Sequence, residues 1–175
     1  MEFSKKTREL SIKKMQERTL DLLIIGGGIT GAGVALQAAA SGLETGLIEM
    51  QDFAEGTSSR STKLVHGGLR YLKQFDVEVV SDTVSERAVV QQIAPHIPKP
   101  DPMLLPVYEE EGATFSLFRL KVAMDLYDLL AGVNNTPAAN KVLSKEEVLE
   151  REPELKKEGL VGGGVYLDFR NNDAR

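Results

Sequence analysis

Residues 22–33 read LLIIGGGITGAG, and this stretch decides the fold. Its four apolar residues have the length of a buried parallel strand, and the alanine-rich segment 34–40 that follows is typical of a helix. Three glycines, Gly26, Gly28 and Gly31, fit the pattern G-x-G-x-x-G. The first permits a tight turn, the second lets a pyrophosphate approach the backbone, and the third lets the helix pack on the strand. The helix N-terminus then directs N–H groups and a positive dipole end at the phosphates.

An acidic residue ends the next apolar run, residues 45–49. Glu49 lies about twenty residues beyond the glycines, where a dinucleotide-binding βαβ unit places a carboxylate that binds ribose hydroxyls. A carboxylate there favours an unphosphorylated ribose, so the expected ligand is FAD or NAD and not NADP. The sequence therefore predicts an α/β fold with a Rossmann-like βαβ unit over residues 20–49.

Composition narrows the classes of function. The chain has 175 residues, enough for one domain with a core, and a net charge of −5, which disfavours non-specific binding to nucleic acid. It has no cysteine, so disulfides, thiolate metal sites and a cysteine nucleophile are excluded, and its two histidines are too few for a histidine-rich metal site. No apolar run approaches the roughly 20 residues of a membrane span. We therefore expect a cytoplasmic protein.

A basic segment, residues 1–19, precedes the first strand. It could form an amphipathic helix that contacts an anionic lipid surface, in this case at the inner membrane. Its apolar residues are sparse, however, so we favour a solvated helix that packs against the domain. The remainder, residues 20–175, starts with the predicted dinucleotide-binding βαβ unit.

Two polar motifs follow Glu49. Residues 52–63 are rich in Ser and Thr and form either a plain surface loop or a loop whose hydroxyls and Lys63 bind phosphate and ribitol oxygens. Next, His66 stands beside two glycines that would let a flat ring or a substrate come close to the backbone, which makes this histidine a candidate acid or base. Arg70 suits a phosphate or carboxylate, but an ordinary surface ion pair explains it equally well on residue chemistry alone.

The rest of the chain predicts further elements. We expect an amphipathic helix over 76–93 and a second, more apolar helix over 113–131. Ser144 and Glu147 predict a capping box that opens a short helix ending before Pro153. Strands are expected over 103–108, at a sheet edge because prolines bound it, and over 165–169. On the first helix the apolar residues expected on one side are Val79, Val80, Val84, Ala88, Val89 and Ile93, with Arg87 among the charged residues elsewhere.

Residues 57–72, TSSRSTKLVHGGLRYL, resemble a segment of the FAD-dependent glycerol-3-phosphate dehydrogenases, a family that includes oxygen-using oxidases. The resemblance runs over nearly the whole chain and matches the N-terminal part of a two-domain flavoprotein of the amino-acid oxidase type. It implies oxidation of sn-glycerol 3-phosphate to dihydroxyacetone phosphate, with hydride transfer to flavin N5. The flavin would be reoxidised by oxygen, giving hydrogen peroxide, or by a quinone.

The resemblance also implies roles for single residues. His66 would be the base or would polarise the substrate oxygen, and Arg70 with Tyr71 would hold the substrate near the flavin. The implied cofactor-binding residues are Gly26, Gly28, Thr30, Gly31, Glu49, Met50, Thr57, Ser58, Thr62, Lys63 and Leu64.

Family members are several times longer than this chain. The resemblance therefore implies that residues 20–175 are an incomplete FAD-binding domain with the start of a substrate region. We expect an N-terminal fragment that folds poorly alone and does not turn over substrate. Two alternatives remain at this point: a non-catalytic fragment that binds a nucleotide, and a flavoprotein oxidase of an amine or amino acid. A homo-oligomer is also compatible with the sequence.

Overall fold

The computed structural model describes residues 4–109 and 116–172. Contacts divide the chain into two compact units, with the boundary between Lys63 and Leu64. This boundary falls inside the range 20–175 that the sequence analysis treats as one incomplete domain. The start of the predicted helix 113–131 lies outside the described residues, as do residues 173–175 of the family resemblance.

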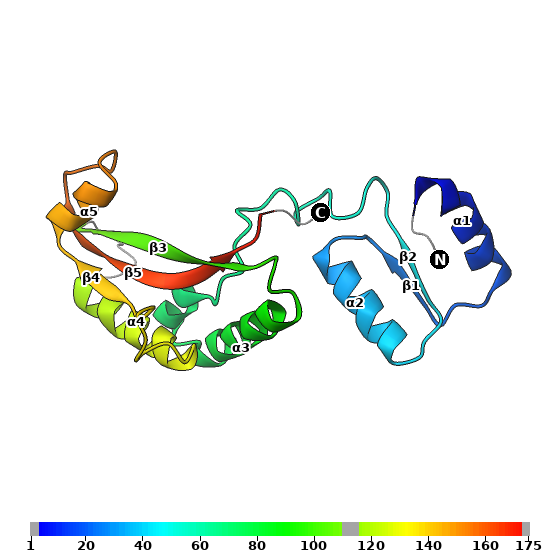
Figure 1. The fold of residues 1–175 in the computed structure, drawn as a ribbon, viewed down its shortest axis with the longest axis horizontal. Coiled ribbons are helices and arrows are strands. Elements are labelled where there is room, and N and C mark those ends of the chain that lie inside the picture. The colour runs from blue at the N-terminus through cyan, green and yellow to red at the C-terminus, as the bar shows by residue number, and fades with distance from the viewer. Residues whose placement is uncertain (1–3, 110–115, 173–175) are drawn as a thin grey trace. The chain divides into compact units, whose positions relative to one another are not determined.

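The first unit contains the βαβ arrangement (Figure 1). Strand β1 (Leu22–Ile25) leads into helix α2 (Ile29–Ala40), which leads into strand β2 (Thr45–Ile48). The two strands are parallel, with Leu22 opposite Thr45 and Ile25 opposite Ile48. Parallel strands need a crossover of this kind, so the predicted βαβ unit is confirmed.

The basic N-terminal segment forms a short 3-10 helix, η1 (Lys5–Thr7), and helix α1 (Arg8–Glu17). No residue of α1 is buried. Met15 nevertheless reaches β2, because a Cβ atom at Gly46 would come within 3.1 Å of its sulfur. The segment is thus a solvated helix that packs on the first unit, as favoured from the sequence, and its contact with lipid stays a prediction.

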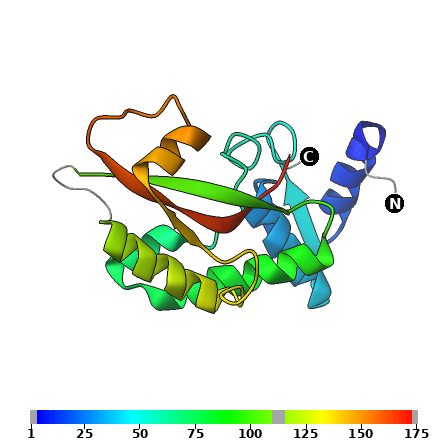
Figure 2. The ribbon, with the colours of Figure 1, turned by 60° about the vertical axis from the view of Figure 1, so that its left-hand side comes forward.

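The second unit is built on a three-stranded antiparallel sheet in the order β3-β5-β4. Figures 1 and 2 show helices α3 and α4 on one face of this sheet and α5 on the other. The elements of this unit are η2 (Leu69–Gln74), α3 (Val77–Ile93), β3 (Lys99–Tyr108), α4 (Leu117–Leu130), β4 (Lys141–Leu143), α5 (Lys145–Arg151) and β5 (Leu160–Arg170).

Alternation along β3 gives the unit two separate cores. Leu105 and Val107 pack with η2, α3 and α4, whereas Leu104 and Tyr108 pack on the opposite face with Val148 of α5. Successive side chains of a strand point to opposite faces, so a single strand serves both cores. Most of the buried apolar side chains of this unit lie in the larger core, between the sheet and the helices α3 and α4.

Both long strands extend further than the sequence predicts. β3 begins at Lys99 and includes Pro100 and Pro102, which an edge strand tolerates because one side of it needs no partner. β5 begins at Leu160 and includes Gly162, Gly163 and Gly164, which lie outside the predicted strand 165–169. A Cβ atom at Gly164 would come within 2.6 Å of Met124, so this glycine lets α4 lie close to the sheet.

The predicted apolar side of α3 is correct only in part. Val80 and Val84 are buried, but Val89 and Ile93 are 46% and 73% exposed. Arg87, predicted to lie away from the core, is instead buried with Val80 and Val84, at 6% exposure. The positions 80, 84 and 87 follow helical spacing, so the face turned to α4 is narrower than the apolar pattern indicates and ends in a charged residue.

The predicted capping box is confirmed, because Ser144 and Glu147 form it reciprocally at the start of α5. The predicted start of the second long helix is wrong: α4 begins at Leu117, and Ser116 caps it by accepting the N–H of Arg119. Within residues 4–109 and 116–172, no helix combines the length and apolarity that crossing a membrane requires.

Candidate functional site

The glycine turn between β1 and α2 has the predicted geometry. Gly26 has φ +108°, a backbone conformation that favours glycine, and its N–H donates to the Ile48 carbonyl at 2.8 Å. A Cβ atom at Gly31 would overlap the carbonyl oxygen of Gly26. Close packing of the helix on the turn therefore requires glycine at position 31.

Glu49 closes this turn from the end of β2. Its Oε2 accepts a hydrogen bond from the Gly27 N–H at 2.8 Å, and its Oε1 accepts one from the Gln51 N–H at 3.1 Å. These two bonds favour the charged form and hold the pKa of the Glu49 carboxyl below its usual value. The side chain is thus an ionised acceptor beside the glycine turn, as a ribose-binding carboxylate needs to be.

The Ser/Thr-rich loop also returns to the turn. Ser58 Oγ accepts the N–H of Ile29, in the first turn of α2, at 2.9 Å. The Ala54 N–H donates to the Gly27 carbonyl at 2.9 Å, and the Phe53 ring occupies the space a side chain at position 27 would need. The structure therefore brings the glycines, Glu49 and Ser58 together. Phe53 was missed, since an aromatic residue in a polar loop gives no local signal of this contact.

The other cofactor-binding candidates are more dispersed. Met50 follows Glu49 and is 91% exposed, and Lys63 closes the loop with φ +59°. Leu64 belongs to the second unit, where it bridges to Arg170 of β5. Three hydroxyl residues are exposed: Thr30, Thr57 and Thr62. A role for any of these residues in cofactor binding stays a prediction.

In the second unit, the three catalytic candidates share one turn. His66 is exposed, whereas the two glycines after it are buried. Gly68, with φ +76°, precedes η2, which carries Arg70 and Tyr71 at the surface. The turn thus presents an imidazole, a guanidinium and a phenol to solvent from a buried backbone.

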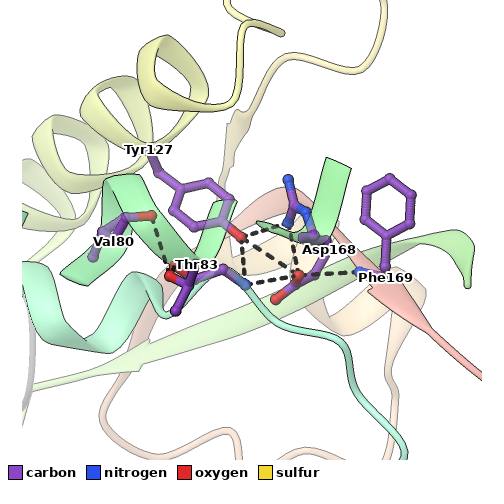
Figure 3. Close-up of polar contacts among 7 residues, drawn as sticks. Val80, Thr83, Tyr127, Asp168 and Phe169 are labelled. Carbon is purple, nitrogen blue, oxygen red and sulfur yellow. Dashed lines mark hydrogen bonds and ion pairs between the residues drawn. The ribbon is translucent and has the colours of Figure 1, made fainter. Parts of the chain in front are cut away.

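A buried polar network lies directly under this turn (Figure 3). Arg87 Nη1 of α3 donates to the Tyr127 hydroxyl at 2.7 Å and to Asp168 Oδ1 at 2.8 Å. The Arg87 guanidinium also lies over the Phe169 ring, 4.6 Å from its centroid. These residues come from α3, α4 and β5, so the network ties three elements of the second unit together.

The network holds the peptide groups of Gly67. Its N–H lies 3.1 Å from the Tyr127 hydroxyl and 3.2 Å from Asp168 Oδ1, and its carbonyl accepts from Thr83 Oγ1 at 2.9 Å. A Cβ atom at position 67 would collide with the Tyr127 hydroxyl. This arrangement was not predicted from the sequence, although a charged residue in helical register with Val80 and Val84 was a signal that Arg87 faces the core.

Burial controls the ionisation of the tyrosines here. Desolvation raises the pKa of Tyr127 well above its usual range, since the neighbouring Arg87 only partly offsets it. Burial likewise raises the pKa of Tyr166 to about 12, and its ring meets that of Tyr127 edge to face. Tyr127 is therefore a neutral phenol that can accept from Gly67 and Arg87 while donating to Asp168.

The first unit fits an adenine dinucleotide. A glycine turn without side chains, a helix N-terminus and an ionised acid at the end of the second strand are the parts such a ligand requires. Two of the backbone N–H groups at this turn are held by partly exposed side chains, those of Glu49 and Ser58. The chemistry of these residues is consistent with phosphate and ribose contacts.

Comparison with known proteins places these features in a wider setting. Residues 21–175 match the model of a family described as FAD dependent oxidoreductase. The chain is 95% identical to alpha-glycerophosphate oxidase from Streptococcus pneumoniae serotype 4, over 100% of this chain and 29% of that protein. The chain thus spans 29% of the length of this curated relative.

Two solved structures extend the comparison. A glycerol-3-phosphate dehydrogenase from Bacillus halodurans, complexed with FAD, has a TM-score of 0.64 and 42% identity, covering 99% of this chain and 26% of that one. An L-proline dehydrogenase from P. horikoshii has a TM-score of 0.57 at 18% identity, covering 88% and 38%. The second likeness concerns the fold alone.

Proposed function

We propose a function that starts from one premise: this chain belongs to the family of FAD-dependent oxidoreductases. The protein that contains it oxidises sn-glycerol 3-phosphate to dihydroxyacetone phosphate. The predicted cofactor, FAD, is confirmed at the level of the family. The proposed substrate is supported by the likeness, along the whole chain, to proteins named alpha-glycerophosphate oxidase.

The first unit would hold the ADP half of FAD. Gly26, Gly28 and Gly31 leave room for the pyrophosphate at the start of α2, and Glu49 would accept hydrogen bonds from the ribose hydroxyls. Ser58 already reaches the helix N-terminus, so its hydroxyl is well placed to contact a bound phosphate. We propose that four of the other candidates contact the part of FAD from the pyrophosphate to the flavin: Thr57, Thr62, Lys63 and Leu64.

The second unit would supply substrate contacts and proton chemistry. FAD, when bound, supplies the hydride acceptor for the alcohol C–H. His66 would take the hydroxyl proton of the substrate, since an exposed imidazole on a buried backbone can be held at a defined place. Arg70 offers two parallel N–H donors to the substrate phosphate, and Tyr71 would help to orient it.

We also propose which electron acceptor reoxidises the flavin. Oxygen, with hydrogen peroxide as product, is favoured by the word oxidase in the names of the relatives. A membrane quinone is the alternative, and contact of α1 with the membrane surface would then bring the protein close to its electron acceptor. Oxidation of an amine or amino acid is less favoured, because the likeness to such enzymes concerns the fold alone.

The test is anaerobic mixing of the FAD-loaded protein, expressed at the full length of its relatives, with glycerol 3-phosphate. We expect the flavin absorbance to bleach, and a His66→Ala variant to bleach roughly 100- to 10,000-fold more slowly. His96→Ala, which alters the other histidine of the chain, is the matched control. No bleaching by the unaltered protein would contradict the substrate, and an unchanged rate in His66→Ala would limit His66 to a structural role.

A further inference from the structure

The peptide group of Gly67 is bound from three different elements. Tyr127 of α4 and Asp168 of β5 bind its N–H, and Thr83 of α3 binds its carbonyl. Tyr127 is 0% exposed and Asp168 is 2% exposed. The next residue towards the N-terminus is His66, whose own side chain is exposed. A fixed peptide thus adjoins the proposed base.

Asp168 is the centre of this arrangement. Four donors lie around its Oδ1: Arg87 Nη1 at 2.8 Å, the Phe169 N–H at 3.0 Å, the Gly67 N–H at 3.2 Å and the Tyr127 hydroxyl at 3.4 Å. Arg87 holds the carboxylate through an ion pair to the same oxygen, and the Arg87 and Asp168 side chains are 6% and 3% exposed. The position of the carboxylate therefore does not depend on its contact with Gly67 alone.

Stability alone gives a weak reason for such a pair. A buried ion pair costs desolvation energy, and apolar residues of similar volume often serve stability as well or better. An apolar replacement could not bind the Gly67 N–H, however, and that group is buried. The particular property of the charged network is that it orients one peptide of the turn carrying His66.

We propose that Asp168, held by Arg87 and Tyr127, is a positioning residue that fixes the His66 turn for reaction. The inference rests on the proposed function, in which His66 removes the hydroxyl proton of the substrate. Proton transfer needs close geometry, and a displacement of about 1 Å can lower a rate by up to roughly 100-fold. Asp168 acts through the backbone of Gly67 and does not itself contact substrate.

Tyr127→Phe is the first variant to make, because it removes one hydroxyl and leaves the ring packing intact. Tyr166→Phe is the matched control, since it removes a hydroxyl from the adjacent ring. Asp168→Asn is the second test, because it removes the charge while keeping the shape of the side chain. Each change is combined with His66→Ala in the full-length, FAD-loaded protein. The readouts are the rate of anaerobic flavin reduction at saturating glycerol 3-phosphate, the FAD content and the thermal midpoint.

We expect Tyr127→Phe to slow flavin reduction roughly ten-fold and Asp168→Asn to slow it more, while Tyr166→Phe leaves the rate unchanged. In the His66→Ala background, neither change should slow the reaction further, because the group they position is gone. Equal slowing in both backgrounds, or no slowing in either, would overturn the positioning role and leave the proposed function intact. Failure of the unaltered protein to reduce its flavin would overturn both proposals.

Discussion

The chain holds two glycine turns in different ways. In the first unit, the N–H groups of Gly27 and Ile29 are bound by Glu49 and Ser58, two side chains with access to solvent. In the second unit, Gly67 is bound by residues that are almost wholly buried. Side chains at the surface can exchange a backbone partner for a ligand, whereas a buried network cannot. The first turn is therefore suited to binding a cofactor, and the second to holding side chains in place.

Breaking the buried pair should give the largest effect. Asp168→Ala leaves Arg87 without its counter-charge at 6% exposure, so we expect a loss of about 3–5 kcal/mol in the stability of the second unit. Urea unfolding combined with hydrogen exchange of the β5 amides measures this change. Asp101→Ala is the control, because it breaks an exposed ion pair with Arg170 of β5, the strand that also carries Asp168. The Arg170 and Asp101 side chains are 61% and 30% exposed, so the loss should be below about 1 kcal/mol.

An apolar replacement of both partners separates charge from packing. The double variant Arg87→Met with Asp168→Leu should recover most of the stability lost in Asp168→Ala, since neither charge then stays buried alone. If the double variant were as unstable as the single one, the network would be needed for the fold itself. The proposed contrast between a first turn that binds cofactor and a second turn that positions side chains would then be wrong.

The second largest effect concerns the packing of α2 on the first turn. Gly31→Ala brings a Cβ atom onto the Gly26 carbonyl, and we expect a loss of about 1–3 kcal/mol together with most of the bound FAD. Gly33→Ala, two residues along the same helix, meets nothing within 4 Å and should stabilise by about 0.5–1 kcal/mol. FAD content after purification and the thermal midpoint test both changes. Retention of FAD by Gly31→Ala would mean that α2 can shift without loss of the site.

The third prediction concerns the charge of Glu49. Hydrogen bonds from the Gly27 and Gln51 N–H groups lower the folded-state pKa of Glu49 below 4.5, so its contribution to stability is present above that pH. The contribution should disappear as the pH falls through the lowered pKa. The difference in thermal midpoint between the unaltered apo protein and Glu49→Gln should therefore stay constant from about pH 7 to pH 5 and shrink below about pH 4.5.

Glu9→Gln, an exposed acid on α1, serves as the control for Glu49→Gln. A difference that grew at low pH would contradict the assigned hydrogen bonds. Loss of the charge should also weaken FAD binding roughly ten-fold, because hydrogen bonds to a charged acceptor are stronger than those to a neutral one.

Local patterns explain why the first turn was predicted well. The spacing of Gly26, Gly28 and Gly31 and the acid at position 49 express contacts within one βαβ unit, so about thirty residues of sequence contain the information. Capping by Ser144 is more local still and was also predicted. The parallel pairing of β1 with β2 followed from the same reasoning.

Long-range contacts explain what was missed. Gly67 and Asp168 are 101 residues apart in sequence, and no spacing rule joins them. Arg87 looked like a surface residue because charge usually lies outside the core, and its burial depends on a partner from β5. The predicted strand 165–169 left out the glycines at 162–164, which the structure includes in β5. Glycine is generally depleted in strands, but here Gly164 lies against Met124 of α4, and its lack of a side chain favours that close approach.

The smallest effect is expected at Ser58, and it tests the contrast most directly. The Ser58 hydroxyl binds the Ile29 N–H at the start of α2 from a partly exposed position, where water can replace it. Ser58→Ala should therefore cost below about 1 kcal/mol in the apo protein, at the lower end of values for helix caps. Ser59→Ala is the matched control, because in the described part of the chain its hydroxyl is not bound to α2. With FAD bound, the Ser58 change should weaken affinity several-fold, because the hydroxyl is then proposed to contact a phosphate. A stability loss in the apo protein as large as that of Asp168→Ala would contradict this contrast. It would show that the Ser58 hydroxyl holds the first turn as rigidly as the buried network holds the second, so FAD could not simply replace this hydrogen bond.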